Sequence, residues 1–146
     1  MTTTERFMGV PPEAVWATLA RAGEFAEWVV GSAGVREADP TWPEPGSRFH
    51  HSVGIGPLVL RDHTEAIEAR PPRLLKLRAN ARPLAVAIVT LELQPHRDGT
   101  RVLMTEELEG PTRLLMANPV GDWFTRARNG KSLERLERLA ARNGTA

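Results

Sequence analysis

The sequence predicts an α+β protein in which an antiparallel sheet wraps around a long C-terminal helix and leaves an apolar cavity between sheet and helix. Two observations lead to this prediction. Between residues 49 and 106, segments that alternate apolar and polar residues are separated by short turns, which is the pattern of an antiparallel meander. From residue 112 onward, residues recur at helical spacing instead, and this pattern continues to about residue 142. Two short helices are expected after the first strand.

The composition is that of one globular domain spanning residues 1–146, with 41% hydrophobic and 25% charged residues. The net charge of +1 creates no overall attraction to nucleic acid or to an anionic membrane. Cysteine is absent, which excludes a disulfide framework and thiolate chemistry. The N-terminus lacks a signal-peptide pattern, and no apolar run approaches the ~20 residues of a membrane span. We therefore expect a soluble cytoplasmic protein, monomeric or homodimeric, without a cofactor, a nucleic-acid partner or an integral membrane segment.

The first elements are a strand and two short helices. Residues 2–9 are rich in threonine and are predicted to form the first strand. Apolar residues at helical spacing predict a helix over 12–21, and Pro12 suits its first turn because the ring fixes the backbone in a helical conformation. Phe25 and Trp28 then anchor a second short helix, which Gly31 is expected to stop.

Six further strands follow, separated by proline and glycine. The first of them is weakly patterned, and the loop after it contains three prolines and Trp42, which we expect to be exposed at the cavity mouth. Gly56 and Pro83 are expected to separate strands, and Asp98-Gly99 marks a tight hairpin. The predicted strands lie at residues 33–39, 49–55, 58–69, 75–79, 87–94 and 102–106.

The C-terminal helix carries a stripe that is apolar in its second half and polar in its first half. The helix is interrupted near Asn118-Pro119, and its unbroken part from residue 122 to 142 would be about 30 Å long. Asp122 and Arg126 either pair with each other or face a partly wet cavity. In the simpler alternative, which we favour, the N-terminal end of this helix is exposed to solvent, or Trp123 and Phe124 pack against the sheet in place of Asp122 and Arg126. The stripe consists of Asp122, Arg126, Asn129, Leu133, Leu136 and Ala140.

Several short motifs occur in an order that resembles one superfamily. They are Pro11-Pro12-Glu13-Ala14-Val15-Trp16, Phe25-Ala26-Glu27-Trp28, Gly46-Ser47-Arg48-Phe49, Glu68-Ala69-Arg70-Pro71-Pro72-Arg73-Leu74, Asp98-Gly99-Thr100-Arg101-Val102, and Arg128-Asn129 with Leu133 and Leu136. Their order resembles the helix-grip fold of the START/Bet v 1-like (SRPBCC) superfamily, and more narrowly its small bacterial polyketide cyclase/dehydrase-type proteins. The resemblance implies the fold across nearly the whole chain. It constrains activity less, because that superfamily includes cyclases, lipid carriers, hormone-binding proteins and chaperone cofactors.

His51 and Asp62 are the candidate catalytic residues. Neighbouring residues of a strand face opposite ways, and the apolar residues of strand 49–55 share the face of His51, so His51 is expected to point inward and His50 outward. On the next strand we expect the face that carries Asp62 to be inward, because the other face carries three chargeable groups. The two side chains would meet across the sheet, either as a general acid/base pair for a carbon-acid substrate or as a structural pair.

Glu106 has two possible placements. If it points inward with Val102 and Met104, an apolar pocket would raise its pKa and make it a proton donor. If the strand ends there, Glu106 lies on the rim, which we favour. No metal site is expected, because no zinc-binding spacing is present. The expected ligand-binding residues are Leu77, Val89, Leu91, Met104, Glu106, Asp122, Arg126, Asn129 and Leu133.

Three functions are compatible with these features. The first is binding of a hydrophobic small molecule, such as a lipid, a polyketide or an aromatic metabolite, between sheet and helix. The second is a cyclase or dehydratase that uses His51 and Asp62. The third is a protein-interaction or co-chaperone module, in which side chains would fill the cavity. The volume and lining of the cavity separate the third from the other two.

Overall fold

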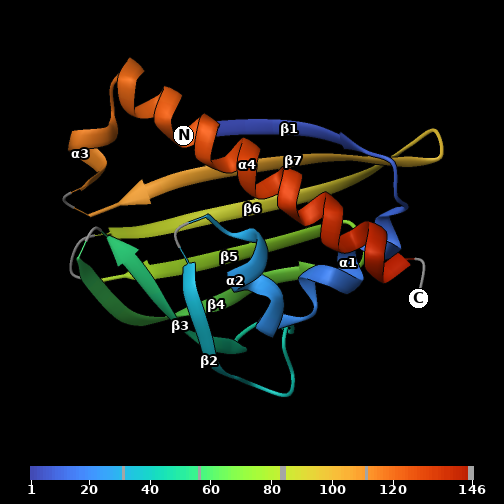
Figure 1. Ribbon diagram of the computed structural model, residues 1–146, viewed down its shortest axis with the longest axis horizontal. Helices are drawn as coiled ribbons and strands as arrows, with labels where there is room; N and C mark the ends of the chain where they lie inside the picture. The colour runs from blue at the N-terminus through green and yellow to red at the C-terminus, as the bar shows by residue number, and fades with distance from the viewer. Residues whose placement is uncertain (31, 56, 83–84, 111, 145–146) are drawn as a thin grey trace.

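A computed structural model describes residues 1–30, 32–55, 57–82, 85–110 and 112–144 (Figure 1). Gly31, Gly56 and Pro83, which the sequence marks as breaks, lie outside these residues. The elements in chain order are β1 (Thr2–Met8), α1 (Pro12–Leu19), the 3₁₀ turn η1 (Ala22–Glu24), α2 (Phe25–Trp28), β2 (Ser32–Ala38), β3 (Arg48–Ile55), β4 (Leu58–Arg70), β5 (Leu74–Ala81), β6 (Ala85–His96), β7 (Gly99–Glu109), α3 (Thr112–Met116) and α4 (Pro119–Gly144).

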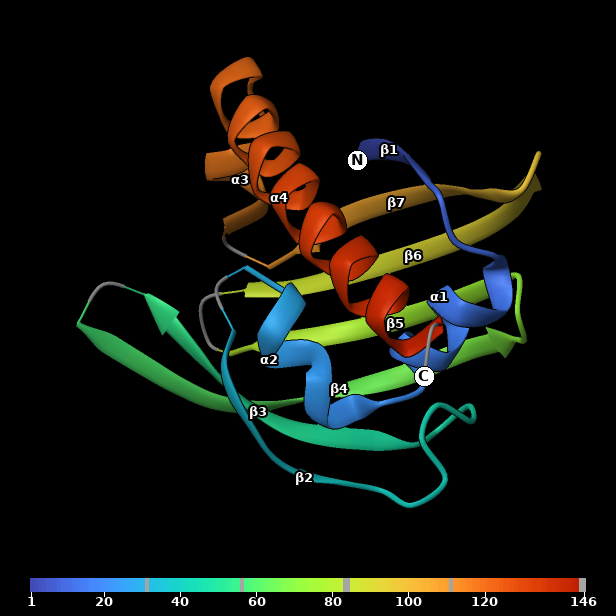
Figure 2. The same ribbon diagram turned by 45° about the vertical axis from the view of Figure 1, so that its right-hand side comes forward.

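The seven strands form one antiparallel sheet in the order β1-β7-β6-β5-β4-β3-β2. Strands β2 to β7 form a meander, and β1 closes the far edge by pairing with β7. Figures 1 and 2 show α4 lying obliquely across one face of the sheet, with α1 and α2 on the same face. This arrangement confirms the predicted α+β helix-grip fold. We call the face toward α4 the inner face.

The core lies between the inner face and the second half of α4. Alternate residues of each central strand point inward, as the period of two requires, and Leu75 and Leu91 are directly opposed across β5 and β6. Leu133 and Leu136 of α4 are fully buried. Burying a leucine side chain contributes about 2 kcal/mol, so the apolar half of the predicted stripe fixes where the helix lies on the sheet.

The start of α4 differs from the prediction. The helix begins at Pro119 and not at Asp122, because the Asn118 side chain caps it by accepting a hydrogen bond of 2.8 Å from Gly121 N–H. The alternative that Trp123 and Phe124 pack inward is wrong, since they are 68% and 58% exposed.

The expectation that Trp42 is exposed at the cavity mouth is also wrong. Trp42 is buried, its indole N–H donates to the Leu19 carbonyl at 3.0 Å, and its ring contacts Phe25 and Phe49. The proline-rich loop folds back onto the core because the large indole surface is stabilised by burial once its N–H has an acceptor.

Two glycines of α4 provide a matched pair of stability probes. A Cβ at Gly121 would overlap the Met116 backbone, lying 2.8 Å from its Cα, whereas a Cβ at Gly130 has nothing within 4 Å. We expect Gly121→Ala to lower the free energy of unfolding by about 1–3 kcal/mol, because the backbone of Met116 must move. We expect Gly130→Ala to raise it by up to about 1 kcal/mol, because alanine favours the helix. Urea denaturation measures both, and equal effects would contradict the close α3–α4 approach.

Candidate functional site

A hollow of about 410 Å³ opens where β7 ends and where α3 and the start of α4 begin. Its wall combines apolar side chains with the charged ends of β7 and α3. The lining residues are Met1, Thr2, Glu106, Glu107, Leu108, Glu109, Arg113, Met116, Ala117 and Thr125. We call this region the open end of the interior.

The inner face of the sheet is less covered toward the open end. Ala79, Ala87 and Leu108 are successive partners in one row across β5, β6 and β7, and all three are only half-buried. The neighbouring row contains Leu77 and Val89, which are buried. Large buried side chains therefore cover the inner face under the second half of α4, whereas the inner face is less covered at Ala79, Ala87 and Leu108.

The apolar residues expected to bind a ligand all lie on the sealed side or at its boundary. Each is at most 8% exposed, and they pack in one core cluster between the sheet and α4. These buried side chains would contact a ligand only where the core meets the open end of the interior. These residues are Leu77, Val89, Leu91, Met104 and Leu133.

Glu106 and Arg128 form an ion pair at the wall of the hollow. Glu106 is 6% exposed and shares the inner face with Val102 and Met104, so the expectation that it lies on the rim is wrong. Its two carboxylate oxygens accept hydrogen bonds from Arg128 Nη2 at 2.6 and 2.5 Å. Glu106 is buried because α4 supplies a guanidinium directly above β7, and a buried carboxylate without such a partner would be strongly destabilising.

Asp122 and Arg126 pair with each other, as one of the two sequence alternatives has it. Arg126 Nε donates to Asp122 Oδ2 at 2.8 Å, and both side chains are exposed, at 60% for Arg126 and 38% for Asp122. Thr2 Oγ1 donates to Asp122 Oδ1 at 2.6 Å, and this hydrogen bond, together with the charge of Arg126, lowers the pKa of Asp122. The pair ties the start of α4 to β1 at the surface, outside the interior.

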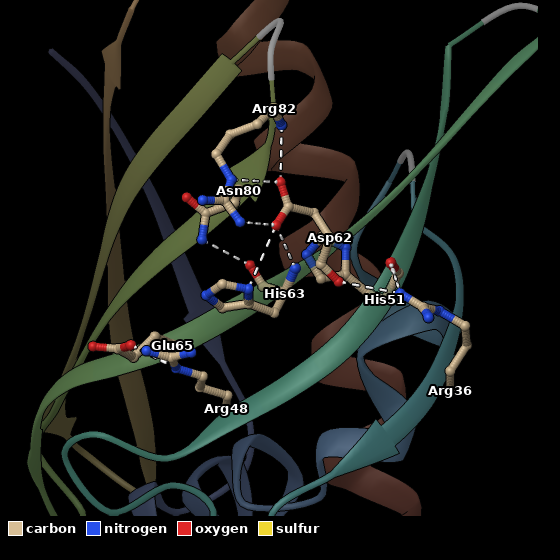
Figure 3. A network of polar contacts seen from close by, with 8 residues as sticks. All are labelled: Arg36, Arg48, His51, Asp62, His63, Glu65, Asn80 and Arg82. Atoms are coloured by element: carbon tan, nitrogen blue, oxygen red, sulfur yellow. Dashed lines mark hydrogen bonds and ion pairs between the residues drawn. The ribbon is translucent and has the colours of Figure 1, made fainter.

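Asp62 lies directly opposite His51 in the β3–β4 register, but its hydrogen bonds go elsewhere (Figure 3). Its carboxylate accepts from Arg82 N at 2.9 Å, from Arg82 Nε at 3.1 Å and Nη2 at 2.8 Å, and from His63 N at 2.9 Å. Burial alone would raise the pKa of Asp62, but these hydrogen bonds and the charge of Arg82 outweigh it and lower the pKa to about 2. Asp62 is therefore a carboxylate at neutral pH.

His51 is buried beside Asp62 and has a free ring nitrogen. Its Nε2 has no hydrogen-bond partner among the described residues. Burial lowers the pKa of His51 below its ordinary 6.5, although a hydrogen bond with the His63 backbone and the charge of Asp62 act in the opposite direction. The imidazole is therefore neutral at pH 7.

Sequence reasoning missed three residues of this region. Arg82 and Arg128 compensate the two buried carboxylates, and Trp28 places a buried indole N–H without a described acceptor in the interior. Arg128 precedes Asn129 in a motif of the resemblance, but the helical stripe did not include it. Arg82 directly follows β5, and the sequence pattern of that strand does not predict that Arg82 pairs with Asp62 of β4.

The surface beside the hollow is apolar. Five exposed apolar side chains lie on α3 and at the start of α4, close in sequence to residues that line the hollow. They are Leu114, Leu115, Val120, Trp123 and Phe124. Within the described residues, no group of three or more His, Asp or Glu side chains is placed to hold a metal ion. No described helix has the length and hydropathy needed to cross a membrane.

The Asp62 carboxylate makes acid stability testable. Because its pKa is about 2 in the folded state and near 3.8 ordinarily, its stabilising contribution is complete above about pH 4 and is lost as the pH falls toward 2. We expect Asp62→Asn to lower the free energy of unfolding by about 2 kcal/mol at pH 7, and this difference from the wild type to shrink steadily below pH 4. Urea denaturation at several pH values measures it. Asp98→Asn, at an exposed hairpin position, is the control with little effect, and a pH-independent difference for Asp62→Asn would contradict the assignment.

Comparison with known proteins identifies the family. Residues 1–141 match the family described as polyketide cyclase / dehydrase and lipid transport. No curated protein matches the chain significantly. Among solved structures, the chain is similar to a Nitrosomonas europaea protein, with 21% identity and a TM-score of 0.73 over 99% of this chain and 96% of that one. A Staphylococcus aureus protein of unknown function aligns with 10% identity and a TM-score of 0.76 over 99% and 95% of the two chains.

A third similar structure is the di-domain ARO/CYC StfQ from the steffimycin biosynthetic pathway. It aligns with 12% identity and a TM-score of 0.70 over 98% of this chain and 49% of that chain. At these identities the structures support the fold alone, whereas the family match spans nearly the whole sequence. The chain belongs to the polyketide cyclase/dehydrase and lipid transport family.

Proposed function

We propose that this protein binds a hydrophobic small molecule of the lipid, polyketide or aromatic class at the open end of the interior. The observation that carries the proposal is the hollow of about 410 Å³ beside the half-buried row of Ala79, Ala87 and Leu108. Ligand pockets of proteins typically have volumes of roughly 300–1,000 Å³. A hollow of this size in a family of cyclases and lipid transporters favours ligand binding over an interaction module.

Two further features support uptake of an apolar molecule. Exposed apolar side chains of α3 and α4, including Leu115 and Phe124, flank the opening, so a lipophilic ligand meets apolar surface before it enters. The wall also carries polar and charged side chains, and the buried Glu106 carboxylate among them is already neutralised by Arg128. Apolar side chains such as Leu108 and Met116 thus lie beside polar groups that can orient a ligand.

Native mass spectrometry and thermal shift against a panel of lipids and polyketide analogues test the proposal. We expect a co-purified lipophilic molecule or a raised melting temperature, because a ligand that binds only the folded state stabilises it. Ala117→Trp, which places a bulky side chain at the wall of the hollow, is expected to weaken binding by tenfold or more. Ala127→Trp, on the exposed surface of α4 and away from the hollow, is the matched control. An empty protein without any thermal shift across the panel would contradict the proposal.

We infer a second candidate function, a cyclase or dehydratase reaction, from the state of His51. A neutral, buried imidazole with a free Nε2 is able to accept a proton from a carbon acid. The adjacent Asp62 carboxylate would then stabilise the imidazolium, because its charge already raises the pKa of His51. Asp62 would act through His51 and would not contact the substrate.

Turnover of a poly-β-ketone analogue over a range of pH tests this second function. We expect the rate to rise as His51 loses its proton below pH 6.5, and to fall by about 10²-fold or more in His51→Ala. Asp62→Asn is expected to reduce the rate and to shift the pH profile toward lower pH, since the imidazolium loses its counter-charge. Wild-type rates in both variants would remove these residues from the mechanism.

A further inference from the structure

Exposed apolar side chains gather on α3 and on the first turns of α4. Among the described residues, five of the nine large apolar side chains that are exposed fall within residues 114–124, at 58% to 83% exposure. Single exposed apolar residues are normal in proteins, whereas a contiguous group of them marks an interaction surface. We call this group the apolar tip, and its members are Leu114, Leu115, Val120, Trp123 and Phe124.

The apolar tip is the outward side of two helices that are held together. Val120, Trp123, Phe124 and Ala127 are exposed at the spacing of one helical face, so the outward face of α4 is apolar over its first two turns. Gly121 beside them is buried, and it approaches the backbone of α3 so closely that a Cβ would overlap it. Figures 1 and 2 show the start of α4 projecting beyond the edge of the sheet, so the tip is accessible to a large partner.

The segment that carries the apolar tip is positively charged. Residues 112–131 contain four basic residues and one acidic residue, so this segment has a charge of +3 and the other residues together have a charge of −2. The net charge of +1 for the whole chain therefore conceals an asymmetry between this segment and the rest. The charged residues of the segment are Arg113, Arg126, Arg128 and Lys131, with Asp122.

Two of these cations are accessible beside the apolar tip. Arg113 is exposed and makes no ion pair with another described residue. Lys131 continues the outward face of α4, and its ammonium lies 3.6 Å from a carboxylate of the same helix. The acidic residues that border the hollow, Glu107 and Glu109, belong to β7, and the Glu109 carboxylate pairs with Arg78 at 3.2 Å. On the two helices themselves, the rim of the apolar tip is therefore positive.

This charge decides which partner fits the apolar tip. A two-fold dimer brings the same patch of both copies together, so Arg113 and Lys131 of each copy would approach those of the other, and like charges oppose association. A negatively charged surface gains from the same cations instead. Tryptophan, phenylalanine and leucine flanked by arginine and lysine are also the composition of helices that lie in the headgroup region of a membrane. Both features favour an anionic lipid surface over a second copy.

We propose that the apolar tip docks on the surface of an anionic lipid bilayer, where its side chains insert among the lipid headgroups and Arg113 and Lys131 contact lipid phosphates. The docking is peripheral, because only the outward side of two helices takes part. It places the mouth of the hollow, which Arg113, Met116 and Ala117 line, at the membrane. The inference goes beyond the proposed ligand binding and does not depend on it, because the tip is an external surface.

Tryptophan fluorescence tests the docking directly. Trp123 is 68% exposed, whereas Trp28 and Trp42 are buried and Trp16 is half-buried, so Trp123 is the tryptophan that reports on the tip. With vesicles of phosphatidylcholine and phosphatidylglycerol in equal parts, we expect its emission to shift to the blue, because the indole leaves water. Vesicles with brominated acyl chains should quench it. Trp123→Phe, which keeps an aromatic ring, assigns the signal and should still bind.

Co-sedimentation with the same vesicles measures the contribution of the apolar side chains. We expect Leu114→Ser combined with Leu115→Ser to weaken binding about tenfold or more, because less apolar surface is inserted. Val120→Ser and Val59→Ser form a matched pair, since both valines are exposed and only Val120 belongs to the tip. We expect Val120→Ser to weaken binding and Val59→Ser to leave it unchanged.

The lipid composition of the vesicles tests the positive rim. We expect the wild type to bind vesicles of phosphatidylcholine alone about tenfold or more weakly than the mixed vesicles, and Arg113→Gln combined with Lys131→Gln to remove most of this difference. Arg97→Gln combined with Arg138→Gln is the control, because it removes the same charge from the β6–β7 hairpin and from the second half of α4. This control should retain the preference for anionic lipid.

Three results would overturn the inference. The first is a wild type that neither co-sediments with the mixed vesicles nor changes its Trp123 emission. The second is wild-type binding by the variant that carries Leu114→Ser and Leu115→Ser, which would place the contact elsewhere. The third is a dimer in solution whose Trp123 is protected from acrylamide without vesicles, because a second copy would then cover the tip. Each result leaves ligand binding in the hollow to be judged separately, since that binding is measured without vesicles.

Discussion

The contact between Glu106 and Arg128 joins the last strand to the long helix at the boundary between the sealed and open parts of the interior. Beyond it, toward the helix C-terminus, Leu133 and Leu136 are buried against the sheet and leave no room. On the N-terminal side of Arg128, α4 has polar or exposed side chains, and Glu106 lines the hollow there. A carboxylate at this position is tolerated only while the guanidinium lies above it, so the same pair that fixes the helix also sets the limit of the site.

The fold was predictable because its two periodicities are strong and local. The period of two in residues 75–79 and 87–94 marked the inner face, and the stripe through Leu133 and Leu136 marked the buried side of the helix. The inward placement of His51 and Asp62 followed from the same rule. Each of these inferences needs only the direction of a side chain relative to its own element.

The partners of the buried groups were not predictable by that reasoning. Glu106 was expected on the rim because the last strand was expected to end there, whereas β7 continues to Glu109. Its partner Arg128 is supplied by α4, and the Asp62 partner Arg82 follows the next strand, so both depend on how elements meet in space. Trp42 was misplaced for the same reason, since its acceptor is a carbonyl of α1. Periodicity gives the face of a residue, whereas tertiary packing supplies the group that makes burial possible.

These ion pairs prevent the two buried carboxylates from leaving an uncompensated charge in the interior. Both buried carboxylates are paired with guanidiniums whose side chains reach solvent, at 59% exposure for Arg82 and 35% for Arg128. The charges therefore cancel at the edges of the sheet and of the helix, and the packed rings of Phe25, Trp28 and Phe49 between them are uncharged. Among the described residues, four buried side-chain atoms have no hydrogen-bond partner: Thr4 Oγ1, Trp28 Nε1, His51 Nε2 and Asn129 Nδ2. A ligand in the hollow would meet groups of both charges, because Glu107, Glu109 and Arg113 line it, so selectivity would depend on how the ligand matches these groups and the apolar side chains between them.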